Sequence, residues 1–279
     1  MRQPWRDKLA VLSGGSSGLG LHIAMALAEQ GAKLVVIGRD QERLEQAAKK
    51  AKAVGAKSVD VFAFDVADET VWQSDSEEIV RWRSFIESNQ LDLLLNVVGR
   101  SDRGMLSSLN AGDVLSQLQT NVLSTFLMTK ACMPSLSQAR GTVVNIGSLA
   151  GILSGPGMGG YSLSKHALVG MHRQWRLEAH DTGVHFMLVC PGPISREESS
   201  GRYDALAESR GLDSKHARPG GGVDLKRLDP KELATLILDG AARRQMELVV
   251  PGKARYLAAL MALWPSWADQ ILRKRFQRD

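Results

Sequence analysis

Short apolar segments alternate with longer amphipathic segments along most of this chain of 279 residues. The short segments are rich in Val, Leu and Ile, as in buried strands, and the longer ones carry apolar residues at helical spacing. The predicted strands are 8–13, 33–38, 58–64, 91–97, 141–147, 184–190 and 247–250, and the predicted helices are 18–30, 40–54, 68–88, 111–137, 161–182 and 229–243. Because helices join parallel strands in βαβ units, this alternation predicts an α/β fold. We expect a doubly wound parallel sheet of about seven strands with helices on both faces.

The composition is that of a chain with one large core. Hydrophobic residues make up 44% of it, which suffices for one large α/β domain. The two cysteines, Cys132 and Cys190, lack the spacing of a metal site or a disulfide framework, so we predict neither. No apolar run reaches the roughly 20 residues that span a bilayer, and the N-terminus lacks the apolar core of a signal peptide. We therefore expect a cytoplasmic protein.

A glycine-rich turn, Ser-Gly-Gly-Ser-Ser-Gly-Leu-Gly at 13–20, connects the first predicted strand to the first predicted helix. Glycine permits a sharp turn and a close approach of ligand to backbone, and the helix N-terminus offers unpaired N–H groups to an anion. Such a turn is typical of a Rossmann-type dinucleotide-binding fold, the alternative being a flexible turn without a ligand. The candidate cofactor-binding residues here are Gly14, Ser16, Ser17, Gly18, Leu19 and Gly20.

The end of the second predicted strand bears on the choice between NAD and NADP. NAD-dependent proteins commonly place a carboxylate there to bind the ribose 2′-hydroxyl, but this chain has Gly38 followed by Arg39, with Arg43 one helical turn later. A guanidinium suits a 2′-phosphate, so NADP is favoured over NAD. A shift of two residues in this alignment would bring Asp40 to the same place and reverse the preference.

Tyr161 and Lys165 are four residues apart in a predicted helix, so they share one face beside the carboxyl edge of the sheet. A free phenol has a pKa of about 10 and is a poor acid or base at neutral pH. A nearby ammonium favours the phenolate and lowers that pKa, so the pair can move a proton. The alternative is a tyrosine packed by its ring beside a solvated lysine.

Together these motifs resemble the short-chain dehydrogenase/reductase family over residues 8–195, with a continuation to about residue 252. The matching segments in chain order are 13–20, Asp-Val at 65–66, Asn-Val-Val-Gly at 96–99, Asn121, Ser148, Tyr161 with Lys165, and Pro-Gly-Pro-Ile at 191–194. The resemblance implies that Tyr161 donates a proton to a carbonyl and that Ser148 hydrogen-bonds the same oxygen. It also implies that Lys165 holds the nicotinamide ribose and lowers the pKa of Tyr161, while Asn121 supports a water relay to Lys165.

These implied roles agree with the chemistry of carbonyl reduction. Hydride addition to a ketone builds negative charge on its oxygen, which a hydroxyl donor and a tunable acid stabilise more in the transition state than in the substrate. The cofactor supplies the hydride, and the protein supplies orientation and electrostatics.

Further cofactor contacts follow from the same resemblance. The residues implied are Asp65 and Val66 at the adenine, Asn96 and Gly99 at the ribose, and Ile194 at the nicotinamide amide, with Pro191 and Gly192 of the same segment as further cofactor-binding residues. Two departures stand out. Asn-Val-Val-Gly replaces the common Asn-Asn-Ala-Gly but keeps Asn96 and Gly99, and Arg196 stands where the family often has a threonine. Ser195 or Arg196 would have to replace the contact of the lost hydroxyl.

We predict a dinucleotide-binding catalytic domain over 1–252 and a basic amphipathic tail over 253–279. Residues 197–229 are too long for an ordinary connection, which predicts a substrate lid or insertion. The net charge is +5, of which the tail contributes +4 from six basic and two acidic residues, so the body is nearly neutral. This distribution argues against a nucleic-acid-binding surface.

The tail predicts an apolar helix up to Trp264, a break at Pro265 and a second helix with Trp267. Tryptophans beside an apolar stripe, flanked by Lys and Arg, are typical of a helix in an anionic membrane interface. The alternative is that this stripe packs on the same subunit or on a partner subunit. We expect a homodimer or homotetramer.

The leading functional hypothesis is an NADP-dependent carbonyl reductase of this family, which transfers a hydride between NADP(H) and a ketone or secondary alcohol. A membrane-bound tail would favour a hydrophobic ketone. One alternative is reduction of a 3-oxoacyl thioester of an acyl carrier protein. Another is a non-catalytic NADP-binding regulator, although such a protein has no evident need for Ser148, Tyr161 and Lys165 together.

Overall fold

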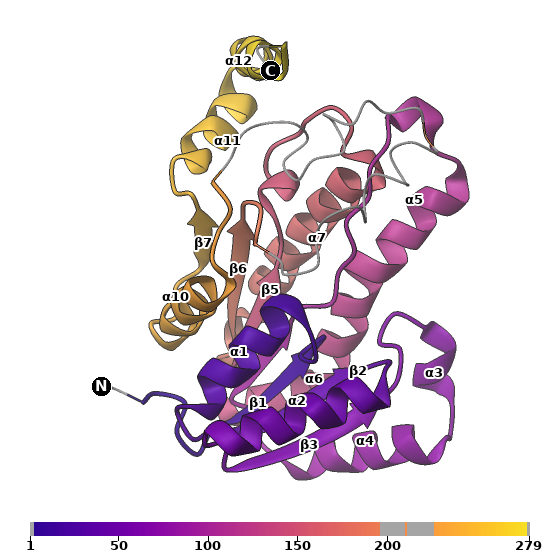
Figure 1. Ribbon diagram of the computed structural model, residues 1–279, viewed down its shortest axis with the longest axis vertical. Coiled ribbons are helices and arrows are strands. Elements are labelled where there is room, and N and C mark those ends of the chain that lie inside the picture. The colour runs from indigo at the N-terminus through magenta and orange to yellow at the C-terminus, as the bar shows by residue number, and fades with distance from the viewer. Residues whose placement is uncertain (1–2, 196–209, 211–225, 278–279) are drawn as a thin grey trace.

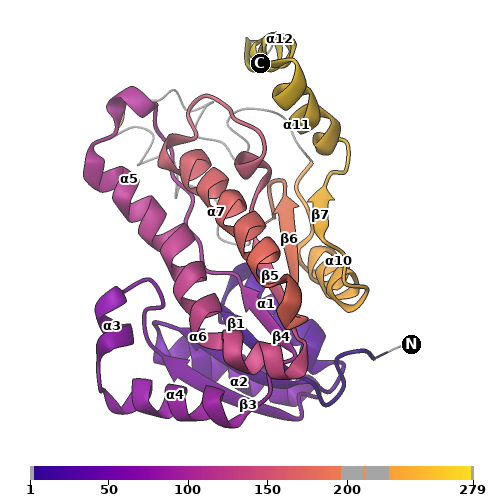
Figure 2. The same ribbon diagram turned by 180° about the vertical axis from the view of Figure 1, so that it is seen from behind.

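A parallel sheet forms the middle layer of the molecule, and helices cover both of its faces (Figures 1 and 2). The computed structural model describes residues 3–195, 210 and 226–277. The strands are β1 Leu9–Ser13, β2 Lys33–Gly38, β3 Ser58–Ala63, β4 Leu93–Asn96, β5 Thr142–Ile146, β6 His185–Pro191 and β7 Glu247–Val250. The α-helices are α1 Gly18–Ala28, α2 Gln41–Val54, α3 Glu69–Gln73, α4 Glu77–Ser88, α5 Ala111–Leu118, α6 Ser124–Ala139, α7 Gly159–Glu178, α10 Pro230–Ala242, α11 Ala254–Leu263 and α12 Pro265–Gln277. The predicted α/β class and the seven predicted strands are confirmed.

The strands lie in the order β3-β2-β1-β4-β5-β6-β7, and every neighbouring pair is parallel. The chain builds outward from β1 to β3 and then crosses back to place β4 on the other side of β1. In a sheet of this kind, ligands bind beyond the carboxyl ends of the strands where the order reverses. The predicted site residues should therefore gather beyond β1 and β4 and their neighbours.

Alternate residues of each strand bury into opposite layers, because successive side chains of a strand point to opposite faces. Leu12 of β1 packs with α1, α2 and α10 on one face. Val11 of β1 packs with α4, α6 and α7 on the other face. Two apolar layers thus hold the sheet rigid, which fixes the positions of the loops at its carboxyl edge.

The prediction of one continuous helix over 68–88 is wrong, because α3 ends at Gln73 and α4 begins at Glu77. Asp68 accepts a hydrogen bond from Thr70 N and caps α3, and Ser76 occupies the N-cap position of α4. The Arg83 side chain donates to the carbonyls of Trp72 and Ser74, which the end of α3 leaves open. Polar side chains that compete for backbone groups favour a break of this kind.

The predicted helix over 111–137 is also interrupted, by a π-helical turn at Gln119–Leu123 between α5 and α6. A π-turn inserts one residue into the helical repeat, and such turns are frequently found at functional sites. Asn121 lies inside this turn and is fully buried. The interruption therefore coincides with a predicted catalytic residue.

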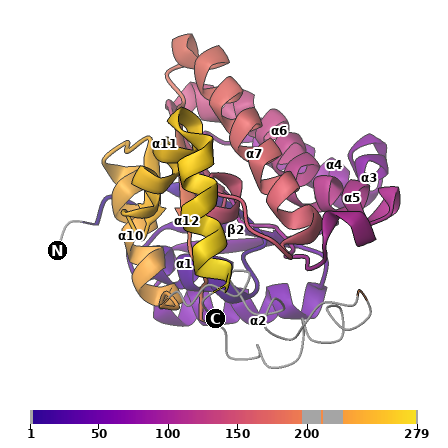
Figure 3. The ribbon, with the colours of Figure 1, turned by 90° about the horizontal axis from the view of Figure 1, so that it is seen from above.

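The two predicted helices of the tail are observed as α11 and α12, with the break at Pro265. Both lie beyond the carboxyl end of β7, outside the layered body (Figures 1 and 3). Tyr256, Leu263, Trp264 and Trp267 are exposed there. Within the described parts of the chain, no helix combines the length and the apolar character needed to cross a bilayer.

Candidate active site

The glycine turn folds back tightly between β1 and α1. Gly14 N donates to Ile37 O of β2 at 2.8 Å. A Cβ on Gly20 would overlap the carbonyl oxygen of Gly14, so only glycine fits there. Gly14 and Gly18 have φ angles of +81° and +50°, which favour glycine. Gly14, Gly18 and Gly20 are the glycines that the sequence predicts for a sharp turn between the first strand and the first helix.

The N-terminus of α1 is open toward a ligand. Its N-cap residue Ser17 makes no side-chain capping bond, and the first turn holds no acidic residue. A Cβ built on Gly18 would meet no atom within 4 Å. The backbone N–H groups here are thus free of a carboxylate and suited to a phosphate. Ser16 and Leu19 lie in the same turn.

The residues predicted to distinguish NADP from NAD lie just beyond the carboxyl end of β2. β2 ends at Gly38, and Asp40 caps α2 by accepting a hydrogen bond from Arg43 N at 3.1 Å. The Arg43 guanidinium also lies 3.4 Å from the Asp40 carboxylate, and Arg39 lies 3.7 Å from Asp65. Both arginine side chains are exposed. Asp40 is therefore engaged as the cap of a helix, two residues beyond Gly38, which ends β2.

Asp65 and Val66 follow the neighbouring strand β3, as predicted. Asp65 Oδ1 accepts a hydrogen bond from Ala67 N at 2.9 Å, and Val66 is buried. Their position beside Arg39 brings the ends of β2 and β3 together at the edge expected for the adenosine half of a dinucleotide.

Asn96, a predicted ribose neighbour, points its side chain into the core. Its Nδ2 donates to Thr129 Oγ1 at 3.1 Å and to Asn145 Oδ1 at 2.9 Å, and the residue is 2% exposed. Asn145 in turn contacts His172 of α7. Burial lowers the pKa of His172 to about 3, so its ring is neutral in this polar network. The Asn96 side chain thus ties β4 to β5 and α6, so only the backbone of this residue could reach a ribose.

Lys165 and Tyr161 share the same face of α7, as their spacing predicts. Lys165 Nζ lies 5.9 Å from the centroid of the Tyr161 ring. The ammonium is 3% exposed and donates to Ile146 O at the end of β5. Burial lowers the pKa of Lys165 from 10.5 to about 8. A cation is therefore held beside the tyrosine at neutral pH.

Asn121 is connected to this pair through the backbone and through α7. Its Oδ1 accepts from Arg100 N at 2.7 Å, and its Nδ2 donates to Ser164 Oγ at 2.9 Å. Ser164 Oγ donates to Tyr161 O. A Cβ on Gly99 would lie 3.1 Å from Asn121 Oδ1 and 3.4 Å from Lys165 Nζ. The absence of a side chain at Gly99 thus leaves the two polar groups facing a common space.

Ser148 follows β5 and lies next to the first turn of α7. Its hydroxyl accepts from Ala150 N at 3.1 Å, and Ser162 Oγ donates to Ala150 O at 2.9 Å. The loop that carries Ser148 is thereby tied to the helix that carries Tyr161. Asn121, Ser148, Tyr161 and Lys165 are thus brought together at the carboxyl ends of β4 and β5.

The predicted nicotinamide contacts follow β6. Pro191 ends that strand, Gly192 N donates to Val250 O at 2.7 Å, and Ile194 pairs with Leu228 in an isolated bridge. They continue the row of strand ends beyond β5. Arg196 and most of the predicted lid at 197–229 lie outside the described residues.

Two features of this site escaped the sequence-based prediction. Gly159, the first residue of α7, adopts a φ of +54°, and the Gly-Gly pair before Tyr161 was a readable signal for it. Asp102 hydrogen-bonds Gly160 N, 58 positions away in the chain. No local pattern indicates a contact at that separation.

The burial of Lys165 leads to a stability prediction. The unfolded chain binds the lysine proton up to about pH 10.5, whereas the folded protein releases it near pH 8. The free energy of unfolding should therefore rise between pH 8 and pH 10.5, and below pH 8 the buried charge costs stability. Replacing Lys165 by methionine is expected to stabilise the cofactor-free protein at pH 7 by about 1–3 kcal/mol.

Urea unfolding at pH 7 and at pH 10 measures this effect. The gain from Lys165→Met should shrink at pH 10, because the native lysine is neutral there. The exposed lysine Lys50 provides the matched control, and Lys50→Met should change stability by less than about 0.5 kcal/mol. A Lys165→Met protein that is less stable than the native one at pH 7 would contradict the cost of this buried charge.

Known proteins are similar to this chain in sequence. Residues 8–204 match the family of short chain dehydrogenases. The chain is 34% identical over 187 residues to the 3-oxoacyl-[acyl-carrier-protein] reductase of Homo sapiens, which covers 67% of this chain and 75% of that protein. It is 26% identical over 281 residues to the dehydrogenase/reductase SDR family member 7B of Danio rerio, covering 98% of this chain and 87% of that protein.

A solved structure gives the same fold. The crystal structure of a short chain dehydrogenase from Burkholderia cenocepacia in complex with NADP aligns with a TM-score of 0.73 at 21% sequence identity, covering 98% of this chain and 99% of that one. The region matched by the family includes the glycine turn, Asn121, Ser148, Tyr161 and Lys165. This protein belongs to the short chain dehydrogenase family of oxidoreductases.

Proposed function

We propose that this protein is an NADP-dependent carbonyl reductase that acts on a hydrophobic ketone and also oxidises the corresponding secondary alcohol. The observation that carries the proposal is the convergence of Asn121, Ser148, Tyr161 and Lys165 at neighbouring strand ends, with Lys165 Nζ 5.9 Å from the Tyr161 ring. A protein that only binds a nucleotide has no evident need for Ser148, Tyr161 and Lys165 together.

The residues of the chain divide the reaction between them. Ser148 donates a hydrogen bond to the carbonyl oxygen, and Tyr161 donates the proton that this oxygen takes up as its negative charge develops. Lys165 keeps a positive charge close to Tyr161, which favours transient loss of the phenolic proton. Asn121 fixes the backbone of Arg100 and the side chain of Ser164, and thereby holds the loop of β4 against α7.

The residues present fit a dinucleotide. The uncapped N-terminus of α1 and the open space at Gly18 would hold the pyrophosphate, and the exposed Arg39 and Arg43 would hold a 2′-phosphate. The nicotinamide cofactor would supply the hydride to the carbonyl carbon. A preference of the protein for NADP over NAD is supported by Gly38 at the end of β2 and by the N-capping role of Asp40.

A second candidate substrate is a 3-oxoacyl thioester. It is supported by the 34% identity to a human protein described as a 3-oxoacyl-[acyl-carrier-protein] reductase. The same four residues would reduce the 3-oxo group, so the two candidates differ in what binds beside the reacting carbonyl.

A panel of substrates tests the function. The purified protein is mixed with NADPH and with aromatic, steroid, long-chain and acyl-thioester ketones, and the absorbance of the reduced nicotinamide is followed. We expect turnover with at least one long-chain or steroid ketone and a lower KM for NADPH than for NADH. Tight NADPH binding without turnover on any ketone would instead favour a non-catalytic regulator.

Arg39→Ala should raise the KM for NADPH and leave that for NADH unchanged.

We further propose that α11 and α12 form a tail that lies on an anionic membrane surface. Trp264 and Trp267 are 59% and 68% exposed, and Leu263 and Tyr256 of the same two helices are exposed as well. Basic residues flank this apolar surface in the sequence, at 253–255 and 273–275. Tryptophan at an apolar surface with flanking cations suits the lipid headgroup region.

Liposome flotation tests this tail. The full chain should float with vesicles that contain phosphatidylserine, and a chain that ends at Gly252 should not. Trp264→Ala with Trp267→Ala provides a milder variant that keeps every basic residue. Equal recovery of all three proteins in the unbound fraction would refute the membrane contact. A smaller particle in light scattering only for the shortened chain would show that the tail joins subunits of the predicted homodimer or homotetramer instead.

A further inference from the structure

The catalytic helix α7 begins without a capping side chain of its own. Its N-cap residue is Met158, which makes no side-chain capping bond, and its first turn contains no acidic residue. This first turn consists of Gly159, Gly160 and Tyr161. The first N–H groups of a helix have no intrahelical partner, and a first turn with two glycines is intrinsically loose. The position of Tyr161 therefore depends on contacts from elsewhere in the fold.

Asp102, in the loop after β4, supplies the missing cap. Its Oδ2 accepts a hydrogen bond from Gly160 N at 3.1 Å, and the residue is 3% exposed. A Cβ on Gly159 would lie 2.8 Å from the same oxygen, so this glycine makes room for the carboxylate. The neighbouring backbone reinforces the contact, because Gly159 N donates to Gly104 O at 2.8 Å. A carboxylate at a helix N-terminus is also favoured by the helix dipole.

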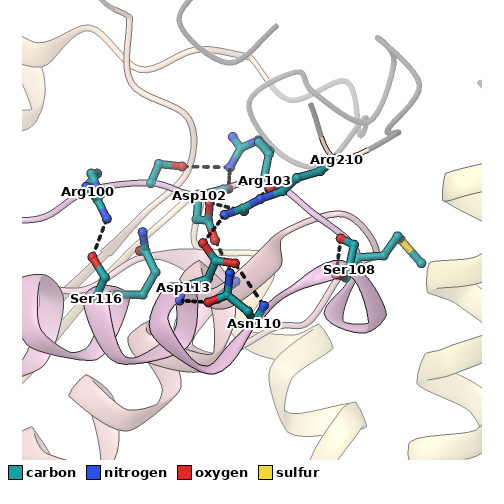
Figure 4. Close-up of polar contacts among 12 residues, drawn as sticks. Arg100, Asp102, Arg103, Ser108, Asn110, Asp113, Ser116 and Arg210 are labelled. Carbon is teal, nitrogen blue, oxygen red and sulfur yellow. Dashed lines mark hydrogen bonds and ion pairs between the residues drawn. The ribbon is translucent and has the colours of Figure 1, made fainter. Parts of the chain in front are cut away.

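Arg210 holds this carboxylate in place (Figure 4). Its Nη1 lies 2.6 Å from Asp102 Oδ1, and its Nη2 lies 2.7 Å from Asp113 Oδ1. Asp113 belongs to the capping box at the start of α5 and accepts a hydrogen bond from Asn110 N. One guanidinium thus joins the carboxylates at the N-termini of α5 and α7. The arginine side chain is 14% exposed, so water screens these ion pairs only weakly.

The two joined helices lead to the predicted catalytic residues. α5 runs into the π-turn that carries Asn121, and α7 carries Tyr161 in its first turn. Gln117 of α5 accepts a hydrogen bond from Asn121 Nδ2 at 3.0 Å. A shift of either helix N-terminus would change the distance between Tyr161 and the substrate carbonyl. A displacement of about 1 Å can cost a catalyst about 100-fold in rate.

We propose that Asp102, held by Arg210, is a positioning residue that fixes the first turn of α7 and thereby orients Tyr161 for proton transfer. The proposal rests on the carbonyl reductase function proposed above. Asp102 itself contacts the backbone of the helix and not the reacting oxygen.

Asp102→Asn tests this role with little change of shape. The amide can still accept the bond from Gly160 N, but its neutral group no longer pairs with Arg210. We expect kcat to fall about 10- to 100-fold, with the affinity for NADPH within about twofold of the native value. Asp181→Asn, in the exposed 3₁₀ turn His180–Thr182 that follows α7, is the matched control and should leave kcat unchanged.

A double-mutant cycle separates positioning from a general structural effect. If Asp102 acts through the Tyr161 hydroxyl, Asp102→Asn should have almost no further effect on kcat in a Tyr161→Phe protein. The same fold-loss in both backgrounds would overturn the proposal. Should Asp102→Asn fail to fold, Arg210→Gln provides the second variant, with an expected loss in kcat of about three- to tenfold by the same argument.

Hydrogen exchange gives a readout that needs no substrate. The amides at the start of α7, residues 159–161, should exchange about fivefold faster in Asp102→Ala, which removes the accepting oxygen, than in the native protein, while the amides of α10 stay unchanged. Unchanged exchange at the start of α7 would overturn the capping role even if no ketone is turned over. If exchange becomes faster but the native protein reduces no ketone, the capping role of Asp102 is supported and the proposed function is refuted.

Discussion

Replacing Tyr161 by phenylalanine is expected to lower kcat by about 10²- to 10⁴-fold and to leave NADPH affinity within about twofold. The substitution removes a single oxygen, and the ring that packs near Lys165 remains. Proton donation to the carbonyl oxygen is then lost, while the groups that would hold the nucleotide, from the turn after β1 to the end of β3, are untouched. Reduced-nicotinamide absorbance gives kcat, and quenching of NADPH fluorescence gives the dissociation constant.

Tyr256 offers the matched control for this substitution. It is 77% exposed on α11, far along the chain from the helix of Tyr161. Tyr256→Phe should therefore leave both kcat and NADPH affinity unchanged. A Tyr161→Phe protein with native turnover would refute the proton-donor role and, with it, the chemical basis of the proposed function.

Replacing Gly20 by alanine is expected to weaken NADPH binding by about 100-fold and to destabilise the fold by about 3 kcal/mol. A Cβ at this position would overlap the Gly14 carbonyl, which is backbone and cannot rotate away. The turn after β1 would have to open, so the N–H groups of α1 would move from the place where a pyrophosphate would bind. Urea unfolding and NADPH titration measure the two effects separately.

Gly170 provides the contrasting glycine. It lies in the middle of α7 on an exposed face, and a Cβ there would meet no atom within 4 Å. Gly170→Ala should stabilise the protein by about 0.5–1 kcal/mol, because alanine loses less conformational entropy in a helix. Native stability and NADPH affinity in Gly20→Ala would show that the turn relaxes without cost, contrary to its packing.

Features that depend on neighbours in the chain were predictable from the amino-acid sequence. The strand–helix alternation predicted the seven strands and the α/β class, because strand and helix periods are local properties. The four-residue spacing of Tyr161 and Lys165 placed them on one face of α7 for the same reason. The positive φ angles of Gly14 and Gly18 follow from the turn that joins β1 to α1.

Features that depend on distant parts of the chain needed the folded molecule. The break between α3 and α4 arises partly because Arg83 reaches back to the carbonyls of Trp72 and Ser74. Asn96 faces the core because Asn145, 49 positions later, lies on the adjacent strand. Asp102 caps α7 across 58 positions of sequence, and Arg210 meets it from still further away. Contacts at such separations leave no periodic pattern in the chain, because they form only when the sheet order brings loops from different strands to the same edge.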